Sequence, residues 1–151
     1  MDTSFDTFFR HLYPSARLVA LRLTGSVRAA EAVAIEAFTD ALVKWRRVRD
    51  LPHRDAWVMR RAVDDALERA RHETPSVRSE DEEPEVRRAL VAALGELPRR
   101  QRDVVLLHHL ARLPLPEVAA AIGISPDDAR AELHQAVAGL RALLEPPGTP
   151  P

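Results

Sequence analysis

The chain has 151 residues, of which 46% are hydrophobic and 30% charged, the balance of a soluble globular protein with one or two small domains. It contains no cysteine, which excludes disulfides, thiolate metal sites and a cysteine nucleophile. Residues 1–6 lack the basic and apolar regions of a signal peptide, and no apolar run approaches the roughly 18 residues of a membrane span, so we expect a cytoplasmic protein without membrane insertion.

The composition predicts an all-α fold. Only 5 glycines and 5% aromatic residues occur, whereas alanine, leucine and arginine, which favour helices, are abundant. Long strands need β-branched and aromatic residues at a period of two, and the chain shows no sustained alternation of that kind.

Residues 1–72 predict a first helical domain of three or four helices. Its first segment carries apolar residues at helical spacing as far as Gly25, a plausible stop, and Pro14 predicts a break. The apolar positions of this segment are Phe5, Phe8, Phe9, Leu12, Tyr13, Leu18, Leu21 and Leu23. A second helix at 29–43 is expected to direct inward Val33, Ala37, Phe38, Ala41 and Leu42. A third helix at 56–71 is expected to have as core residues Trp57, Val63 and Leu67.

Residues 73–85 predict an acidic flexible linker. They combine two prolines and one aliphatic residue with a net charge of −5, so they cannot bury enough apolar surface to fold alone. The flanking segments, 1–72 and 86–151, carry +3 and +1, so the overall net charge of −1 comes from this one stretch. Residues 146–151 form a Pro/Gly tail that is expected to be disordered.

Residues 86–145 predict a second helical domain, with helices at 86–94, 99–110, 116–122 and 126–144. Gly123 permits a left-handed turn, Ser125 is a good N-cap, and Pro126 suits the first position of the last helix. A short helix, a glycine turn and a second helix form the helix-turn-helix pattern, whose second helix can enter a major groove. The same spacing also fits a plain αα-hairpin.

Two sets of motifs resemble the extracytoplasmic-function (ECF) sigma factors over nearly the whole chain. The helix-turn-helix and the stretch before it resemble region 4 of these sigma factors. That stretch is Leu97-Pro98-Arg99-Arg100-Gln101-Arg102-Asp103-Val104-Val105-Leu106-Leu107. Four short motifs in the first domain resemble region 2 of these sigma factors. They are Leu21-Arg22-Leu23-Thr24-Gly25, Ala30-Glu31, Glu36-Ala37-Phe38 and Ala56-Trp57. The resemblance implies a sigma factor with two helical domains that binds core RNA polymerase, through the clamp helices of its largest subunit and its flap, and promoter DNA.

The resemblance also implies a role for individual residues. The surface that binds the clamp helices would include Glu31, Ala32, Ile35, Glu36 and Asp40. The −10 element, whose melted bases need a basic groove and stacking surfaces, would be met by Lys44, Trp45, Arg46, Arg47, Arg49, Trp57, Arg60 and Arg61. The −35 element would be met weakly by Ser125, Asp127, Asp128, Arg130, Ala131, His134 and Gln135.

The sequence departs from the family at several of these positions. Ala32 and Ile35 stand where the family has an acidic residue and a glutamine, and Val63-Asp64 stands where an Arg-Asn pair is common. Residues 126–139 carry one arginine against three acidic residues, a net of −2, where the family has several basic residues. Since phosphate neutralisation supplies much of the affinity for DNA, we expect weak −35 binding and better −10 binding.

Two functions from different classes remain open. The first is an ECF-type sigma factor that directs promoter-specific initiation. The second is a degenerate sigma-like regulator that binds polymerase, an anti-sigma factor or another regulator without recognising promoters itself. A general helix-turn-helix repressor fits less well because it leaves the first domain without a role. An anti-sigma partner is expected by family analogy only.

Neither a nucleophile elbow nor a phosphate-binding loop is present, and His108-His109 lack thiol partners, so we predict no enzyme activity, cofactor or metal site.

Overall fold

The computed structural model describes residues 3–72 and 84–145, and every regular element among them is helical, which confirms the all-α prediction. The elements are α1 (Thr3–Thr24), α2 (Val27–Val43), α3 (Trp45–Val48), α4 (Arg54–His72), α5 (Pro84–Glu96), α6 (Arg99–Val105), a π-helical turn η1 (Leu106–Leu110), α7 (Leu115–Ile122) and α8 (Pro126–Leu144). The predicted tail and all but the last two residues of the predicted linker lie outside the described residues; those two, Pro84 and Glu85, begin α5. Within the described ranges, no helix is both long and apolar enough to cross a membrane.

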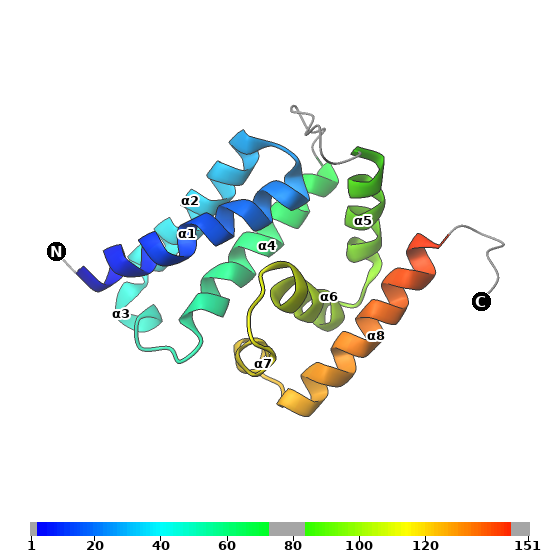
Figure 1. Ribbon diagram of the computed structural model, residues 1–151. Helices are drawn as coiled ribbons and strands as arrows, with labels where there is room; N and C mark the ends of the chain where they lie inside the picture. Colours follow the sequence, from blue (N-terminus) through cyan, green and yellow to red (C-terminus); the bar gives the residue numbers. More distant parts are fainter. Residues whose placement is uncertain (1–2, 73–83, 146–151) are drawn as a thin grey trace.

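The first module consists of α1, α2, α3 and α4, with the three long helices packed on one another (Figure 1). Its core is an aromatic cluster around Phe38, which is almost fully buried. The Phe38 ring lies 5.1 Å from the ring of Phe9 in an edge-on arrangement, 5.7 Å from Phe8 and 6.0 Å from Tyr13, between centroids. Edge-to-face and tilted aromatic pairs add stability beyond the apolar area that they bury.

The predicted break at Pro14 is wrong, because α1 runs through it without interruption. Proline removes one backbone hydrogen bond and crowds the preceding turn, which normally kinks or ends a helix. Here Pro14 is exposed, and the helix is anchored on both sides of it by buried residues, including Leu12 and Ala16. Burial of the two halves against α2 and α4 therefore outweighs the local penalty.

Two residues predicted to face the core, Leu18 and Leu42, are instead exposed. In α2 the inner face is taken by Phe38 and Ala41, so Leu42, one position further along, turns outward. α1 ends in a turn at Gly25, which has a φ of +67°, and the Ser26 hydroxyl then accepts a hydrogen bond from the Ala29 backbone N–H and caps α2.

The second module consists of α5, α6, η1, α7 and α8, and its α7 and α8 form the predicted helix-turn-helix. Gly123 adopts the left-handed conformation with a φ of +79°, and the Ser125 hydroxyl accepts a hydrogen bond of 3.0 Å from the Asp128 backbone N–H. Val118 is fully buried at the centre of the motif. The expected regular helix over 99–110 is instead an α-helix that widens into the η1 turn. Within this turn, His108 Nδ1 lies 2.9 Å from the Leu113 carbonyl oxygen.

The two modules pack directly on each other. Figure 1 shows α4 in the middle of the molecule, between α1 and α2 on one side and α5, α6 and α7 on the other. The helix that carries Trp57, Arg60 and Arg61 is therefore part of both the first module and the junction.

Candidate functional site

The outer face of α2 combines exposed apolar and acidic side chains. Ile35 is 49% exposed, Leu42 54% and Val43 78%, and together they form an apolar stripe along one side of the helix. We call these three residues the α2 stripe. Exposed apolar groups that cluster on one helix face are typical of a surface that binds another protein.

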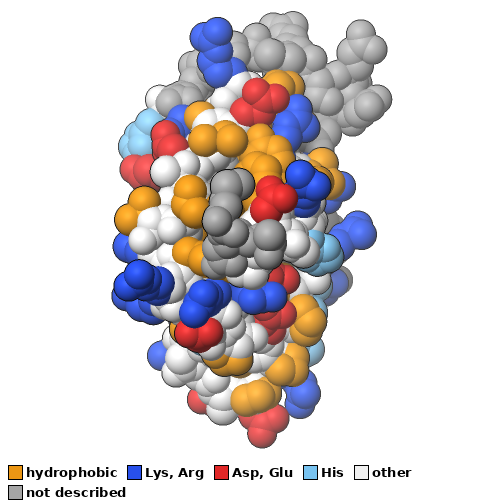
Figure 2. Space-filling model, turned by 90° about the vertical axis from the view of Figure 1, so that its left-hand side faces the viewer, with side chains coloured by type: hydrophobic (Ala, Val, Ile, Leu, Met, Phe, Trp, Pro, Cys, Tyr) orange, Lys and Arg blue, Asp and Glu red, His pale blue; other side chains and the backbone are white. Residues whose placement is uncertain are grey.

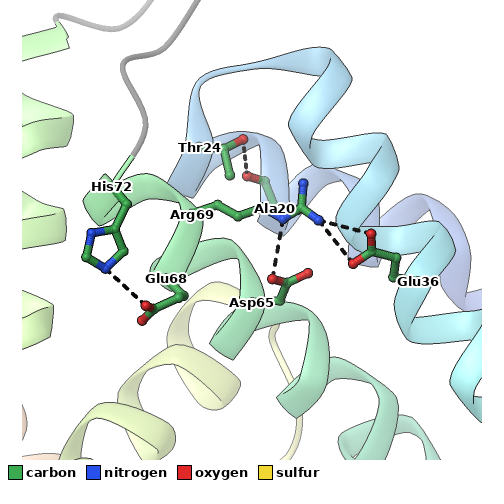
Figure 3. A network of polar contacts seen from close by, with 7 residues as sticks. All are labelled: Ala20, Thr24, Glu36, Asp65, Glu68, Arg69 and His72. Carbon is green, nitrogen blue, oxygen red and sulfur yellow. Dashed lines mark hydrogen bonds and ion pairs between the residues drawn. The ribbon is translucent and has the colours of Figure 1, made fainter.

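The two glutamates predicted to bind polymerase flank the α2 stripe, and both form ion pairs within the first module. Arg69 of α4 reaches across to Glu36 and donates to both of its carboxylate oxygens at 3.0 Å (Figure 3). Glu31 lies 3.5 Å from Arg17 of α1. Both glutamates remain exposed, so these pairs orient the carboxylates without hiding them. Ala32, from the same predicted set, is half-buried.

Asp40, the last residue of that predicted set, lies in the neighbouring basic cluster. Its carboxylate is 3.3 Å from Lys44 Nζ and 2.6 Å from a terminal nitrogen of Arg61. Both cations lie over the ring of Trp57, Arg61 at 4.5 Å and Lys44 at 5.9 Å from its centroid. We call these four residues, Asp40, Lys44, Trp57 and Arg61, the Trp57 platform. A half-buried indole beside two cations suits an unpaired base and its phosphate.

Substituting Asp40 by asparagine removes the one carboxylate of the Trp57 platform, and we expect the affinity for single-stranded DNA to rise severalfold because Lys44 and Arg61 are no longer neutralised. The free energy of unfolding should change by no more than about 1 kcal/mol, since partly exposed ion pairs contribute little. Fluorescence anisotropy with a labelled oligonucleotide measures the affinity. The control is Glu68→Gln, which removes an exposed carboxylate paired with His72 near the other end of α4; an equal gain there would show that only net charge matters.

The remaining predicted −10 residues take different places. Trp45 is only 6% exposed, its ring packs 5.2 Å from both Phe5 and Phe8, and its indole N–H donates to Ser4 at 3.2 Å, so it serves the core. The side chains of Arg46, Arg47 and Arg49 are exposed on and after α3. Seen from the end of the molecule where α1 begins and α3 lies, lysine and arginine side chains form a band across the surface (Figure 2).

Arg60 is not part of the Trp57 platform, because its side chain pairs with the second module at the junction between the modules. Its terminal nitrogen donates to Asp103 of α6 at 3.1 Å, and Asp103 is 1% exposed. Asp103 was not among the predicted site residues. A signal was present, because Asp103 lies four residues before buried Leu107, on the inward face of its helix, among several arginines.

The outer face of α8 carries the residues predicted to meet the −35 element. Asp127 lies 3.5 Å from Arg130 and is almost wholly exposed, whereas Ser125 is occupied as the N-cap. Gln135 accepts a hydrogen bond from Gln101 of α6 at 3.1 Å. The other predicted residues, Asp128, Ala131 and His134, are exposed. This face is sterically open to a partner but offers few cations to it.

An apolar groove of about 580 Å³ crosses the second module between α5, η1 and α8. Its walls include Leu90, Leu94, Leu110, Leu140 and Leu144, and its rim carries polar or charged side chains from His109, Arg141 and Glu145. A groove with such apolar walls suits the apolar face of a helix.

These features define a two-module, all-helical protein with a C-terminal helix-turn-helix. Its sequence is similar to those of several known proteins. Residues 87–140 match the family described as sigma-70, region 4. Over 113 residues the chain is 34% identical to the RNA polymerase sigma-E factor of Streptomyces antibioticus, a match that covers 68% of this chain and 63% of that relative. Over 92 residues it is 37% identical to the RNA polymerase sigma factor CarQ of Myxococcus xanthus, covering 60% and 53%. The chain thus matches less than two thirds of the length of these relatives.

Two solved structures share the fold. One is CnrH in complex with the cytosolic domain of CnrY, with a TM-score of 0.62 and 22% identity, covering 94% of this chain and 88% of that one. The other is the sigma factor RpoE in complex with the anti-sigma factor NepR from Bartonella quintana, with a TM-score of 0.64 and 17% identity, covering 95% and 98%. The sequence matches assign residues 87–140 to the sigma-70, region 4 family and support the ECF sigma factor family for the chain.

Proposed function

We propose that this protein binds core RNA polymerase and directs initiation at a small set of promoters. The observation that carries the proposal is the position of the α2 stripe beside the Trp57 platform, two surfaces linked through Asp40. A protein that docks through the first surface presents the second to the DNA strand that the same partner opens. Family membership supplies the identity of the partner.

In this proposal the clamp helices of the largest polymerase subunit bind the α2 stripe, with Glu31 and Glu36 at its edges. Apolar contact supplies most of the affinity, because a few well-packed side chains at the centre of an interface dominate binding. The glutamates then select a basic partner and fix the orientation. Ile35, which replaces the family's usual glutamine, strengthens the apolar part.

Replacing Ile35 by aspartate should weaken binding to core polymerase by about tenfold or more, since a charge would enter the centre of the apolar contact. Leu18→Asp is the matched control, because Leu18 is similarly exposed on α1, outside the α2 stripe. Surface plasmon resonance with immobilised core polymerase gives both affinities. Equal affinities for the two variants would place the polymerase contact elsewhere.

The −10 element would be met by the Trp57 platform together with Arg46, Arg47 and Arg49. An unpaired base can stack against Trp57 while its phosphates meet the neighbouring cations, which requires no duplex groove. Contact with the −35 element falls to α8 and is weak, because its outer face carries more acidic than basic residues between 126 and 139.

The apolar groove of the second module would bind the flap of core polymerase. An apolar helix fills such a groove, and His109, Arg141 and Glu145 at its rim can set the register.

An anti-sigma factor is the further partner that we propose. It is supported by the two solved structures that share the fold, one in complex with an anti-sigma factor and the other with a cytosolic domain.

A second candidate function is favoured by α8. A recognition helix with a net charge of −2 over 126–139 suits a regulator that binds polymerase or another protein and has lost independent promoter reading. The two functions share the polymerase contact and differ in selective transcription, which a run-off assay with core polymerase measures.

A further inference from the structure

The apolar groove of the second module includes the C-terminal end of α8 in its walls. Its floor is buried, since Leu94 and Leu106 are 3% and 2% exposed, whereas Leu144 at its edge is 43% exposed. Apart from three polar side chains at the rim, every side chain that lines the groove is aliphatic. Aliphatic side chains gathered in one groove form a contiguous apolar surface of the kind that another molecule covers.

The C-terminal end of α8 has the pattern of a helix that binds in such a groove. Its apolar side chains Val137, Leu140 and Leu144 stand at positions i, i+3 and i+7, the spacing at which an amphipathic helix places its anchors in a groove. All three also line the groove, so one face of α8 is both a wall of the groove and a fitting occupant for the groove of another molecule. A second copy of the same chain would bury both surfaces at once.

Two opposite charges lie along one edge of this apolar face. Arg141 and Glu145 are four residues apart at the rim of the groove, and both are exposed. Within residues 3–72 and 84–145, neither side chain forms an ion pair. Glu145 also follows directly on the last residue of α8, where the negative end of the helix dipole disfavours a carboxylate. A cation supplied by a partner would therefore stabilise Glu145.

An antiparallel pair of α8 helices brings these charges together. A twofold axis between two antiparallel helices keeps the same edge of each helix on the same side of the interface. When the axis passes midway between positions 141 and 145, Arg141 of each copy faces Glu145 of the other, and two ion pairs form. The end of α8 is therefore complementary to itself in charge as well as in apolar surface.

We propose that the apolar groove is the interface of a symmetric dimer, in which the C-terminal ends of two α8 helices pack antiparallel. The end of α8 lies at the edge of the molecule away from α1 and α2 (Figure 1), so the α2 stripe stays accessible in this dimer. The groove is also the proposed site for the polymerase flap, and each copy in the dimer hides it. This masking rests on the proposed function, whereas the dimer itself does not.

Sedimentation equilibrium of the full chain, at concentrations up to the millimolar range, tests the dimer without polymerase or DNA. The contact is limited to one groove and one helix end, so we expect a reversible dimer with a dissociation constant in the micromolar range. A parent chain that stays monomeric throughout would overturn the proposal.

Charge reversal at the rim tests how the two copies pair. Arg141→Glu and Glu145→Arg should each weaken the dimer about tenfold or more, because like charges then face each other. An equal mixture of the two variants should dimerise as tightly as the parent, since one copy carries two acidic residues at these positions and the other two arginines. A loss of folding would not produce this rescue. Arg130→Glu, the same reversal near the start of α8, is the matched control and should leave the dimer unchanged.

Two results would overturn the antiparallel pairing: an Arg141→Glu variant that dimerises like the parent, or a mixture without rescue. The groove itself is tested by Leu144→Asp, which places a charge in its apolar wall and should abolish the dimer. Because Leu144 is exposed, the variant should keep its fold, which circular dichroism checks. A dimer that survives Leu144→Asp would show that the groove is not the interface.

Native mass spectrometry with core polymerase tests the masking. At concentrations at which the parent chain is dimeric, each polymerase should carry one copy, because the flap and a second copy compete for one groove. Two copies on one polymerase would overturn the masking and leave the dimer intact. If no form of the chain bound polymerase, the proposed function would fail, while the sedimentation experiments would still decide whether the chain dimerises.

Discussion

Replacing Phe38 by alanine should destabilise the protein by about 3–5 kcal/mol, the cost of removing a fully buried aromatic ring and leaving a cavity. Phe38 is 2% exposed and lies against the rings of Phe8, Phe9 and Tyr13, all from α1, so its removal takes away the central aromatic contact between α1 and α2. A small protein has only about 5–15 kcal/mol of total stability, so we expect the variant to be partly unfolded at 37 °C.

Urea denaturation followed by circular dichroism measures the change in the free energy of unfolding. The matched control is Phe5→Ala, which removes a ring of the same size from the half-buried edge of the same cluster. It should cost distinctly less, because water can fill the space that remains. If the two variants cost the same, Phe38 is not the centre of the core.

Placing arginine at both Ala131 and Gln135 should increase the affinity for duplex DNA roughly ten- to a hundredfold at about 0.1 M salt. The dependence of the affinity on salt concentration should become steeper, by an amount that corresponds to up to about two additional phosphate contacts. Both side chains are exposed one turn apart on the outer face of α8, the face that a helix-turn-helix directs toward DNA. The double substitution also removes the exposed hydrogen bond between Gln135 and Gln101, which should matter little for folding.

Titrations of a labelled duplex at several salt concentrations give the affinity and its slope. The control adds the same charge elsewhere, as Ser15→Arg with Leu18→Arg on α1. A gain limited to the α8 variant would show that α8 faces DNA and that its natural charge limits −35 binding. Equal gains would show that α8 has no special position, and would favour the regulator that does not read promoters.

Much of the fold could be predicted from the sequence because it is local. The helix-turn-helix follows from Gly123, the Ser125 cap and Pro126, whose conformations are set by their own chemistry. The inward face of α2 follows from helical periodicity around Phe38, although the same pattern wrongly included Leu42, one position outside the buried stripe. The predicted break at Pro14 is wrong because burial of α1 on both sides of the proline outweighs the local cost of a proline inside a helix.

The junction could not be predicted in the same way. The pairing of Arg60 with Asp103 joins residues 43 positions apart, and no periodicity or motif specifies which arginine a buried aspartate meets. The same holds for the Trp57 platform, in which Asp40 was assigned to the polymerase surface from its place in the motif but reaches Lys44 and Arg61. These contacts depend on how whole helices pack, which local sequence does not determine.

The most direct test of the central claim is run-off transcription by the purified protein with core RNA polymerase on a genomic promoter library, preceded by a pull-down of the two. Stable binding with a small set of selective transcripts, both strongly reduced by Ile35→Asp, is the result that a sigma factor predicts. Binding without selective transcripts would contradict promoter-specific initiation and leave the polymerase-binding regulator. Absence of binding by the folded protein would contradict the polymerase contact itself.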